Sequence, residues 1–475
     1  MMGQEFRGWR GARAPLPWGG GVVVVLVMLG GVAWGQFGEL PPARGQTAAD
    51  DKAAEEAKNA YEANLVKHRG NADVLVLPGL VADRKSKQVR IWGKATGVGH
   101  GDPVEFFVIP PDSGKEYEAM VVGFVKPSDV HRALEFIGMK GGRAVNFAAN
   151  QFWPKGERVL MTVEWEQAGK AGLQRVRAEE LVIDARTGKA LAKTGLVFTG
   201  SFWIKPEEEG GKERYAADVV DPRAIAANFN CWAAVMDVPR QAIQGEVYGS
   251  QKLNPAYQFA AGQGVQIVLE PEYKDGRVRV VDLSLRAEIG ARGVEFVLKD
   301  AAEKKVNEGP TLVHVLAACN TLIEGGRDPF VAVSVDERMT VEQVRELYQL
   351  LMSVEGEEGI RIEGPAEGEL FCRAFFPRED WRERKNRLGR PWELHLEGGK
   401  DGTLILPADE IDDNRGMGDL TFKVKSGEEV AKVLTEKSDR FSMSVCVFVP
   451  GKMRYGEMMG FLRAGMKTHK TVYVF

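Results

Sequence analysis

Apolar and polar residues alternate at every second position over most of residues 71–247, in short stretches rich in β-branched and aromatic side chains. This alternation is typical of strands that bury one face. One stretch with clear helical spacing interrupts it, so the pattern predicts a β-rich domain with one central helix. Helical and strand patterns then alternate to the end of the chain. We therefore expect an α+β protein in which the β-rich domain precedes two small αβ units.

The central helix is predicted from its start signal and its apolar face. Residues 126–129 (Lys-Pro-Ser-Asp) are a typical helix beginning, in which Ser128 or Asp129 could cap the helix. Apolar positions with helical spacing follow, namely Val130, Ala133, Leu134 and Ile137. Glycine at 138, or at 141 and 142, is expected to end the helix.

The C-terminal part of the chain contains an internal repeat. Apolar positions recur 114 residues apart, with Val333, Val335, Met339 and Val341 matched by Val447, Val449, Met453 and Tyr455. In each copy they predict a strand, a short loop and an amphipathic helix, with a further helix before them and a further strand after them. We expect two ββαβαβ-like units at 248–366 and 392–475, joined by a charged linker at 367–391. The first should carry an extra hairpin turned at Asp275-Gly276.

The N-terminal residues 1–35 have the parts of an export signal. Three arginines form its positive region, namely Arg7, Arg10 and Arg13. An apolar run at 22–32 follows, and then small residues in Ala33-Trp34-Gly35 suit a cleavage site. The run is short for a membrane span, which favours cleavage, although an uncleaved anchor is the alternative. We expect a periplasmic or secreted protein that contacts the membrane only through this segment, if it is uncleaved. Residues 36–70 should form a linker with a short spacer helix.

Composition and charge narrow the class of protein. The 475 residues are 44% apolar and 27% charged, which excludes a largely disordered chain. A formal net charge of −4 gives no reason to expect a nucleic-acid partner. The four cysteines are scattered without a CxxC pair, which does not support zinc or redox motifs; they are Cys231, Cys319, Cys372 and Cys446. Buried free thiols are favoured, with a Cys372–Cys446 disulfide as the alternative that export would permit.

Residues 115–142, KEYEAMVVGFVKPSDVHRALEFIGMKGG, resemble the core signature of YdjY-like domains. In that signature an acidic strand precedes a Pro-Ser-x-x-His-x-Ala-Leu helix start and a glycine-rich exit. The later FTGS at 198–201 and YAADVVDPRAIAANFN at 215–230 fit the end of the same family, so the resemblance covers about residues 72–245. It implies an exported domain of undefined biochemical role. Ferredoxin-type cysteine clusters are absent from the sequence, so no iron–sulfur cofactor is expected.

The order of elements in the two C-terminal units resembles the periplasmic domain of ExbD/TolR-type proteins, over residues 290–365 and 392–475. This resemblance implies a fold and a tendency to pair or to dock on partners. The membrane helix with an essential acidic residue, which that family carries, has no counterpart in either copy. Proton-driven coupling is therefore not implied.

Glu116, Glu118 and His131 are the most suggestive polar residues. The two glutamates are expected on one face of a strand because they stand two positions apart, and His131 lies in the first turn of the following helix. One imidazole and two carboxylates could bind a metal or a polar ligand. The alternative, which we favour, is structural: the histidine bonds a backbone group or a neighbouring carboxylate, and the glutamates are solvated. We assign no catalytic residue, no metal ligand and no cofactor.

Motifs of metalloproteases, α/β-hydrolases and phosphate-binding loops are absent from the sequence. The favoured function is therefore a non-enzymatic interaction or scaffold protein of the cell envelope with a protein partner. The alternative is a periplasmic domain that binds a small ligand or a metal, with or without an enzymatic activity, centred on Glu118 and His131.

Overall fold

The chain divides into two compact units, Met1–Gly38 and Glu39–Phe475. The computed structural model describes residues 48–146, 153–166, 172–205, 211, 213–240, 242, 244–257, 259–273, 280–325, 327–352, 361–363, 371–375, 391–398, 401–406, 420–437, 444–465 and 471–475. All of these belong to the second unit, and none of their helices is both long enough and apolar enough to cross a bilayer. The expected export signal at 1–35 lies outside the described residues.

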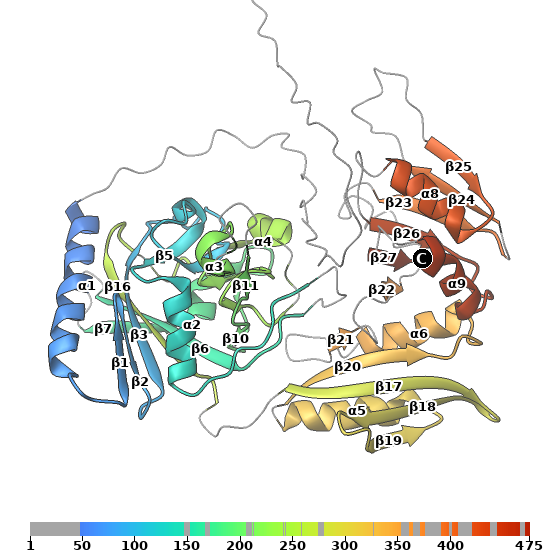
Figure 1. Cartoon of the computed structure of the whole chain (residues 1–475), viewed down its shortest axis with the longest axis horizontal. Helices are drawn as coiled ribbons and strands as arrows, with labels where there is room; N and C mark the ends of the chain where they lie inside the picture. The colour runs from blue at the N-terminus through green and yellow to red at the C-terminus, as the bar shows by residue number, and fades with distance from the viewer. Residues whose placement is uncertain are drawn as a thin grey trace, which may run out of the picture. The chain divides into compact units, whose positions relative to one another are not determined.

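The N-terminal part is built on one eleven-stranded sheet, with the order β1-β2-β3-β16-β6-β10-β14-β13-β4-β5 and with β7 beside β6 (Figure 1). β3 pairs with both β16 and β5, so the strands from β3 to β5 in this order close on themselves. The strands are β1 (Val74–Leu77), β2 (Leu80–Asp83), β3 (Gln88–Ala95), β4 (Phe106–Ile109), β5 (Ala119–Gly123), β6 (Arg158–Glu166), β7 (Leu173–Arg177), β10 (Leu196–Phe198), β13 (Ala226–Ala227), β14 (Met236–Asp237) and β16 (Gly264–Pro271).

Smaller elements surround this sheet. Two further sheets pair β11 with β12 and order the remaining short strands as β15-β8-β9. Their strands are β8 (Val182–Asp184), β9 (Lys189–Ala190), β11 (Trp203–Ile204), β12 (Arg214–Tyr215) and β15 (Gln251–Leu253). The helices and 3₁₀ turns are α1 (Ala48–Lys67), η1 (Glu116–Glu118), α2 (Pro127–Phe136), η3 (Ala178–Leu181), α3 (Ala216–Val219) and α4 (Gln244–Ser250).

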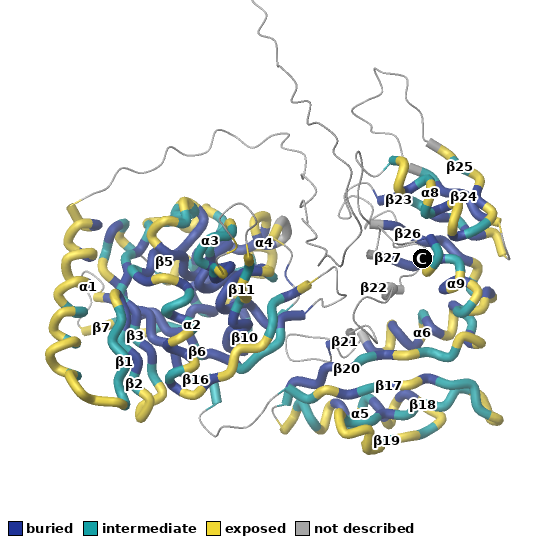
Figure 2. Tube along the Cα trace, in the orientation of Figure 1, coloured by how far each residue is buried: buried dark blue, intermediate teal, exposed yellow. Residues whose placement is uncertain are grey.

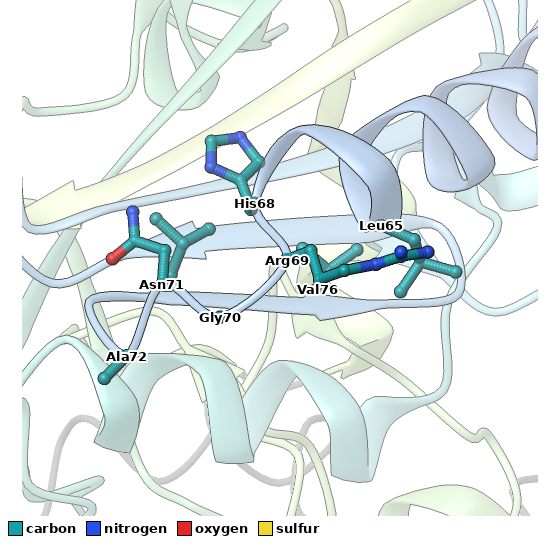
Figure 3. A pocket seen from close by; sticks show the side chains of 8 residues that line it. Leu65, His68, Arg69, Gly70, Asn71, Ala72 and Val76 are labelled. Carbon is teal, nitrogen blue, oxygen red and sulfur yellow. The ribbon is translucent and has the colours of Figure 1, made fainter.

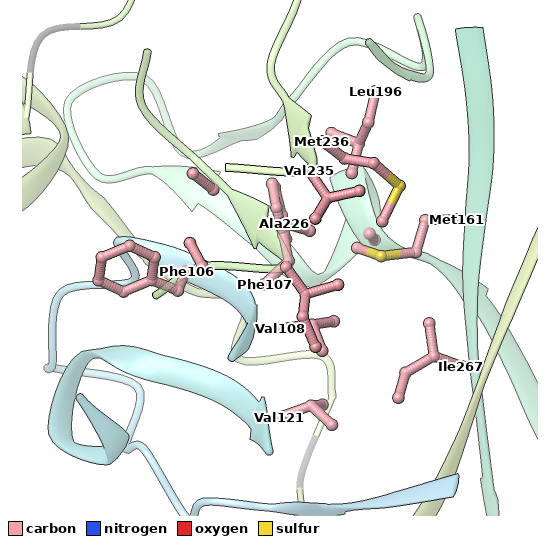
Figure 4. Packing of buried hydrophobic residues seen from close by; sticks show 14 of the residues in the cluster. Phe106, Phe107, Val108, Val121, Met161, Leu196, Ala226, Val235, Met236 and Ile267 are labelled. Atoms are coloured by element: carbon pink, nitrogen blue, oxygen red, sulfur yellow. The ribbon is translucent and has the colours of Figure 1, made fainter. Parts of the chain in front are cut away.

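The interior of the closed sheet is filled by apolar side chains from strands far apart in the sequence (Figure 4). Val108, Val121, Met161, Met236 and Ile267 come from five different strands and are all buried. Burying such a side chain contributes about 1.5–3 kcal/mol, so this cluster is the main source of stability in the domain.

Helix α1 packs on the sheet and is not a spacer. It contacts β3 and β16, and its small residues Ala53 and Ala57 are buried while its other side is exposed (Figures 1 and 2). Lys94 Nζ donates to Asp50 Oδ1 at 2.8 Å. At Gly262, where φ is +77°, a Cβ would lie 2.9 Å from Ala49 Cβ, so a glycine is required for this close approach. The helix expected within residues 36–70 is present, but the expectation that it is a spacer is wrong, because an alanine face has little hydrophobic signal.

Helix α2 is the predicted central helix, but it begins differently. Lys126 is the N-cap residue and Pro127 occupies the first turn, where its fixed φ suits the helix. The predicted caps Ser128 and Asp129 are therefore wrong. Instead, Asp218 of α3 accepts a hydrogen bond from the Ser128 N–H at 2.9 Å. The cap thus comes from a residue 90 positions later, which no local pattern could indicate.

The two C-terminal units have the same topology. Their sheets have the orders β19-β18-β17-β20-β21 and β22-β27-β26-β23-β24-β25. The first strand along the chain is β17 in one unit and β23 in the other. Each pairs with an antiparallel strand on one side and with a parallel strand on the other, and a helix precedes each of the last two strands of the unit. Each unit thus contains the order βββαβαβ, with one more strand than predicted, and β22 adds a sixth strand to the second sheet. The elements are β17 (Val280–Gly290), β18 (Gly293–Asp300), β19 (Lys305–Gly309), α5 (Leu312–Glu324), β20 (Asp328–Val335), α6 (Val341–Met352), β21 (Arg361–Glu363), β22 (Phe371–Phe375), β23 (Trp392–Leu396), β24 (Gly402–Leu406), β25 (Leu420–Val424), α8 (Gly427–Lys437), β26 (Ser444–Phe448), α9 (Tyr455–Gly465) and β27 (Thr471–Val474).

Two predicted boundaries are wrong. The first unit does not begin at residue 248, because β15 pairs with β8 and β16 pairs with β3 and β6. β15 and β16 therefore belong to the N-terminal part of the fold, and β16 pairs with β3 and β6 and not with β17 among the described residues. Asp275-Gly276 lie outside the described residues. The predicted linker at 367–391 contains β22, which pairs with β27. Periodicity identifies a strand but not its partner.

The two C-terminal units meet through a contact with local two-fold symmetry. The N–H of Val341 donates to the carbonyl of Met453 at 2.9 Å, and the N–H of Tyr455 donates to the carbonyl of Met339 at 2.7 Å. Each residue stands 114 positions from its counterpart, and the residues between them form an isolated antiparallel bridge. This is the reciprocal arrangement of an isologous dimer, formed here within one chain.

A buried ion cluster joins β6 to the first C-terminal unit. Arg158 Nη2 lies 3.1 Å from Asp328 Oδ2, and Arg361 Nη1 lies 4.0 Å from the other carboxylate oxygen. All three residues are buried.

The cysteine thiols Cys231, Cys319 and Cys446 are free and buried, and the side chain of Cys372 lies outside the described residues.

Candidate functional site

Glu118 lies in a single 3₁₀ turn, η1, and not on a strand. Its N–H donates to the carbonyl of Lys115 at 3.2 Å, and β5 begins at the next residue. The prediction that Glu116 and Glu118 share one strand face is therefore wrong, because a two-residue spacing does not distinguish a strand from a short helical turn. Glu116 is half-buried and Glu118 is buried.

Glu118 lies near a second buried carboxyl group, that of Glu105, whose N–H donates to the Glu118 carbonyl at 2.9 Å. Burial raises the pKa of both carboxyl groups, and the charge of Glu118 contributes to raising that of Glu105 to about 7. Lys115 Nζ lies 3.5 Å from Glu118 Oε1 as an ion pair, but that oxygen accepts no hydrogen bond among the described residues. An acceptor without a donor can take a proton or a donor from a ligand.

One amide side chain and one backbone N–H hold Glu105 in place. Gln244 Nε2 donates to Glu105 Oε2 at 2.7 Å, and the N–H of Asn228 donates to the Glu105 carbonyl at 2.8 Å. Asn228 in turn donates through Nδ2 to Gln251 Oε1 at 2.6 Å and accepts from Arg240 Nη2 at 3.2 Å. No local pattern in the sequence indicates this network, because its members come from separate segments of the chain.

His131 belongs to a different group of contacts. Its Nδ1 lies 2.8 Å from both the Gly200 carbonyl oxygen and Tyr215 Oη, and its Nε2 lies 3.2 Å from Glu135 Oε1, one helical turn later. Tyr215 Oη also donates to the Gly200 carbonyl at 2.7 Å. A backbone group and a neighbouring carboxylate are the partners expected of a structural histidine.

The loop that carries Gly200 is fixed by its neighbours. Thr199 Oγ1 donates to the Ala234 and Val235 carbonyls at 2.8 and 2.9 Å, and Ser201 Oγ donates to the Ala233 carbonyl at 2.7 Å. Gly200 has φ of +80°, and a Cβ there would lie 3.2 Å from His131 Cε1. The FTGS segment therefore positions the strand that follows it.

The structure does not bring the three predicted residues into one site. The described residues contain no hydrogen bond or ion pair between His131 and either Glu116 or Glu118. Among the described residues, no group of three or more His, Cys, Asp or Glu side chains could hold a metal ion.

Exposed aromatic side chains follow the fixed loop. Phe202, Trp203 and Trp232 are 37%, 64% and 41% exposed, and we call these three residues the aromatic surface. Phe202 packs on Trp232 with ring centroids 5.4 Å apart, and Trp203 packs on its cross-strand partner Tyr215 at 5.4 Å. Spacing along the chain does not predict this surface. The adjacent aromatic pair Phe202-Trp203 shortly after Gly200 is the sequence feature that could have indicated it.

An open hollow lies between the end of α1 and β1 (Figure 3). Its lining includes His68, Arg69 and Asn71, whose side chains spread apart rather than converge. Asn71 Oδ1 is already used, since it accepts the N–H of Asp73 at 3.0 Å. These side chains therefore do not form a site for a small polar ligand.

Comparison with known proteins gives one family. Residues 80–269 match the family model of the YdjY domain, which confirms the resemblance seen in the sequence and extends it through β16. No curated protein matches the chain.

Proposed function

We propose that this protein is a non-enzymatic interaction protein of the cell envelope, and that its YdjY domain contacts a partner through the aromatic surface. The observation that carries the proposal is the exposure of Trp203 and Trp232 beside a tightly held loop. Tryptophan is enriched at the centres of binding interfaces, where its burial contributes most to affinity. An indole left 64% exposed contributes little to folding.

A second surface supports a protein partner. The outer side of α5 carries Val313, which is 68% exposed, and α5 has one charged residue, Glu324. The equivalent helix α8 carries five charged residues, namely Glu428, Glu429, Lys432, Glu436 and Lys437. The helix at this position of the fold thus has one charged residue in the first C-terminal unit and five in the second, as expected if only α5 is covered by a partner.

Two finer features of the proposal rest on sequence patterns. We propose that both C-terminal units are related to the periplasmic domain of ExbD/TolR-type proteins, which is supported by their repeated βββαβαβ order. We also propose export through residues 1–35, with periplasmic or secreted localisation. Mass spectrometry of the mature N-terminus tests export: a chain that begins near Gln36 agrees with it, and a cytosolic chain that retains Met1 contradicts it.

Site-directed photo-crosslinking in the native cell tests the function. A photoreactive residue at Trp203 or Val313 should give a discrete adduct. The matched control is Leu173, which is apolar and 58% exposed but lies on β7, a strand that pairs with β6 and carries no residue of either surface. Adducts at neither position, or equal adducts at Leu173, would reject the proposal.

One observation favours a second candidate, a small polar ligand at Glu118. The unused acceptor Oε1 of this buried residue could bind a ligand donor. A ligand that binds the folded state raises the melting temperature. A screen of polar metabolites should then give a shift in the wild type that Glu118→Gln abolishes, and no shift with any compound counts against this candidate.

A further inference from the structure

We propose that the open edge of strand β1 binds an extended peptide segment of a partner protein, which carries apolar and acidic side chains and adds one strand to the sheet. This edge lies beside the end of α1 and contains no residue of the aromatic surface. The inference therefore goes beyond the proposed function.

The main-chain groups of β1 leave one edge of this strand open. β1 pairs only with β2, and the N–H of Arg84 donates to the Asp73 carbonyl at 2.9 Å at the end of that ladder. Bonded and non-bonded pairs alternate in an antiparallel ladder, so the main-chain groups of Val74 and Val76 point away from β2. The Val74 N–H is used, since it donates to the Asn71 carbonyl at 3.2 Å. Among the described residues, the Val76 N–H and the carbonyls of Val74 and Val76 bond no other group.

The side chains of β1 are apolar on both faces. Leu75 and Leu77 pack on the main core, whereas Val74 and Val76 line the open hollow together with Leu65 of α1 (Figure 3). Leu65 is 44% exposed. Paired residues of neighbouring strands point to the same face of a sheet, so the residue opposite Val76 on an added strand would place its side chain over this hollow. The hollow thus suits an apolar side chain of that strand.

The other edge strand of the same sheet, β7, is protected by charge. It pairs only with β6, and it carries Arg175 and Arg177. Arg175 is paired with Glu164 at 3.4 Å and Arg177 with Glu179 at 2.7 Å. Charged side chains on an edge strand hinder the addition of another strand. β1 has the sequence Val-Leu-Val-Leu without a charge, so the two edges differ as expected if only β1 receives a partner strand.

The end of α1 beside this edge is basic. Lys67, His68 and Arg69 follow one another there, and His68 and Arg69 line the hollow. None of the three forms an ion pair among the described residues. Asp73, the acidic residue next to β1, is instead paired with Lys85 at 2.8 Å. Positive charge without a counter-charge favours a segment with acidic side chains and disfavours a basic one.

A second copy of the chain fits the edge less well than a separate segment does. Two β1 strands could pair antiparallel with Val76 opposite either Val76 or Val74 of the other copy. One carbonyl of each strand would then face Pro78, which has no N–H, or the Val74 N–H, which is bonded to Asn71. A partner segment with an N–H at each position can bond all three open groups of β1.

Selection of a displayed library of random dodecapeptides against the full chain tests the inference. We expect the enriched peptides to contain an acidic residue and to have apolar residues at alternate positions. A synthetic copy of the most enriched peptide should bind the wild type with saturation in fluorescence anisotropy. Its affinity should fall when the backbone nitrogens that face β1 are methylated, because main-chain hydrogen bonds supply much of the affinity in this mode of binding.

Variants of the edge locate the bound peptide. Val76→Pro removes the outward N–H without removing a bond to β2, and Val76→Lys gives β1 a charged edge like that of β7. Each should weaken binding of the enriched peptide about tenfold or more. The matched control Leu173→Lys, which places a lysine on the other edge, should bind as the wild type does. Arg69→Glu should weaken binding most at low salt.

Three results would overturn the inference: no enriched peptide, enriched peptides without acidic residues, or equal affinity of the enriched peptide for Val76→Lys and Leu173→Lys. A wild-type dimer in sedimentation that Val76→Lys makes monomeric would also overturn it, since the edge would then belong to a second copy. Denaturant unfolding checks that each variant folds, and Arg69→Glu, an exposed change at the helix end, keeps the test valid if Val76→Pro does not. Trp203→Ala should bind the peptide as the wild type does, so the proposed function can fail separately.

Discussion

At the scale of single residues, the molecule concentrates unusual chemistry at Glu105 and Glu118. Glu118 and His131 stand out in the sequence as candidates, but their partners do not. Glu105, Gln244 and the Gly200 carbonyl come from distant segments, and only the closed sheet brings them to these side chains. The sequence therefore indicates which side chains are candidates for chemistry. It does not indicate which neighbouring groups bond to them or shift their pKa values.

The raised pKa of Glu105 predicts a pH-dependent stability. Because the folded protein binds this proton more tightly than the unfolded chain does, the contribution of Glu105 to the free energy of unfolding is greatest below pH 4.5, falls as pH rises to about 7 and is constant above it. The shift to about 7 corresponds to a loss of about 3 kcal/mol. Denaturant unfolding of Glu105→Gln from pH 4 to 8 should show a clearly flatter profile than the wild type. An unchanged slope would contradict this electrostatic description.

The buried hydroxyl of Tyr215 gives a second prediction. Tyr215→Phe removes the bond to the Gly200 carbonyl and the contact with His131 Nδ1, and should cost about 1–2 kcal/mol in the free energy of unfolding. The matched control is Tyr61→Phe, which alters a tyrosine of α1 and should change stability by less than about 0.5 kcal/mol. Equal effects of the two substitutions would show that the Gly200 loop does not depend on this bond.

At the scale of elements, periodicity identifies α2, the strands of the first sheet and the repeated helix–strand order. It fails at three places for physical reasons. The alanine face of α1 has too little hydrophobicity to indicate packing, β16 carries no signal for its distant partners, and β22 lies within a charged segment. In each case the deciding contact is long-range, and local sequence does not encode it.

Two glycines of α9 provide a matched test of the contact between the two C-terminal units. A Cβ at Gly456 would lie 2.6 Å from Glu337 Cβ, whereas a Cβ at Gly460 would meet nothing within 4 Å. Gly456→Ala should therefore destabilise the protein by about 1–3 kcal/mol through overpacking. Gly460→Ala should stabilise it by about 0.5–1 kcal/mol through helix propensity. Thermal unfolding that shifts both variants in the same direction would contradict the isologous contact.

At the scale of the whole molecule, the buried cluster around Asp328 predicts cooperativity between β6 and the first C-terminal unit. Asp328→Asn removes the buried carboxylate that Arg158 and Arg361 share, which should cost about 3–5 kcal/mol. Asp282→Asn removes the exposed pair with Lys155 and should cost less than about 1 kcal/mol. Calorimetry should show a lower transition temperature for the first variant alone.

The measurement that tests the central claim most directly compares folding and binding in the Trp203→Ala and Trp232→Ala variants. If the aromatic surface serves a partner, each variant should unfold within about 0.5 kcal/mol of the wild type, while the fraction of protein retained on washed cell envelopes falls sharply. A loss of several kcal/mol with unchanged retention would show that these side chains stabilise the fold and do not contact a partner.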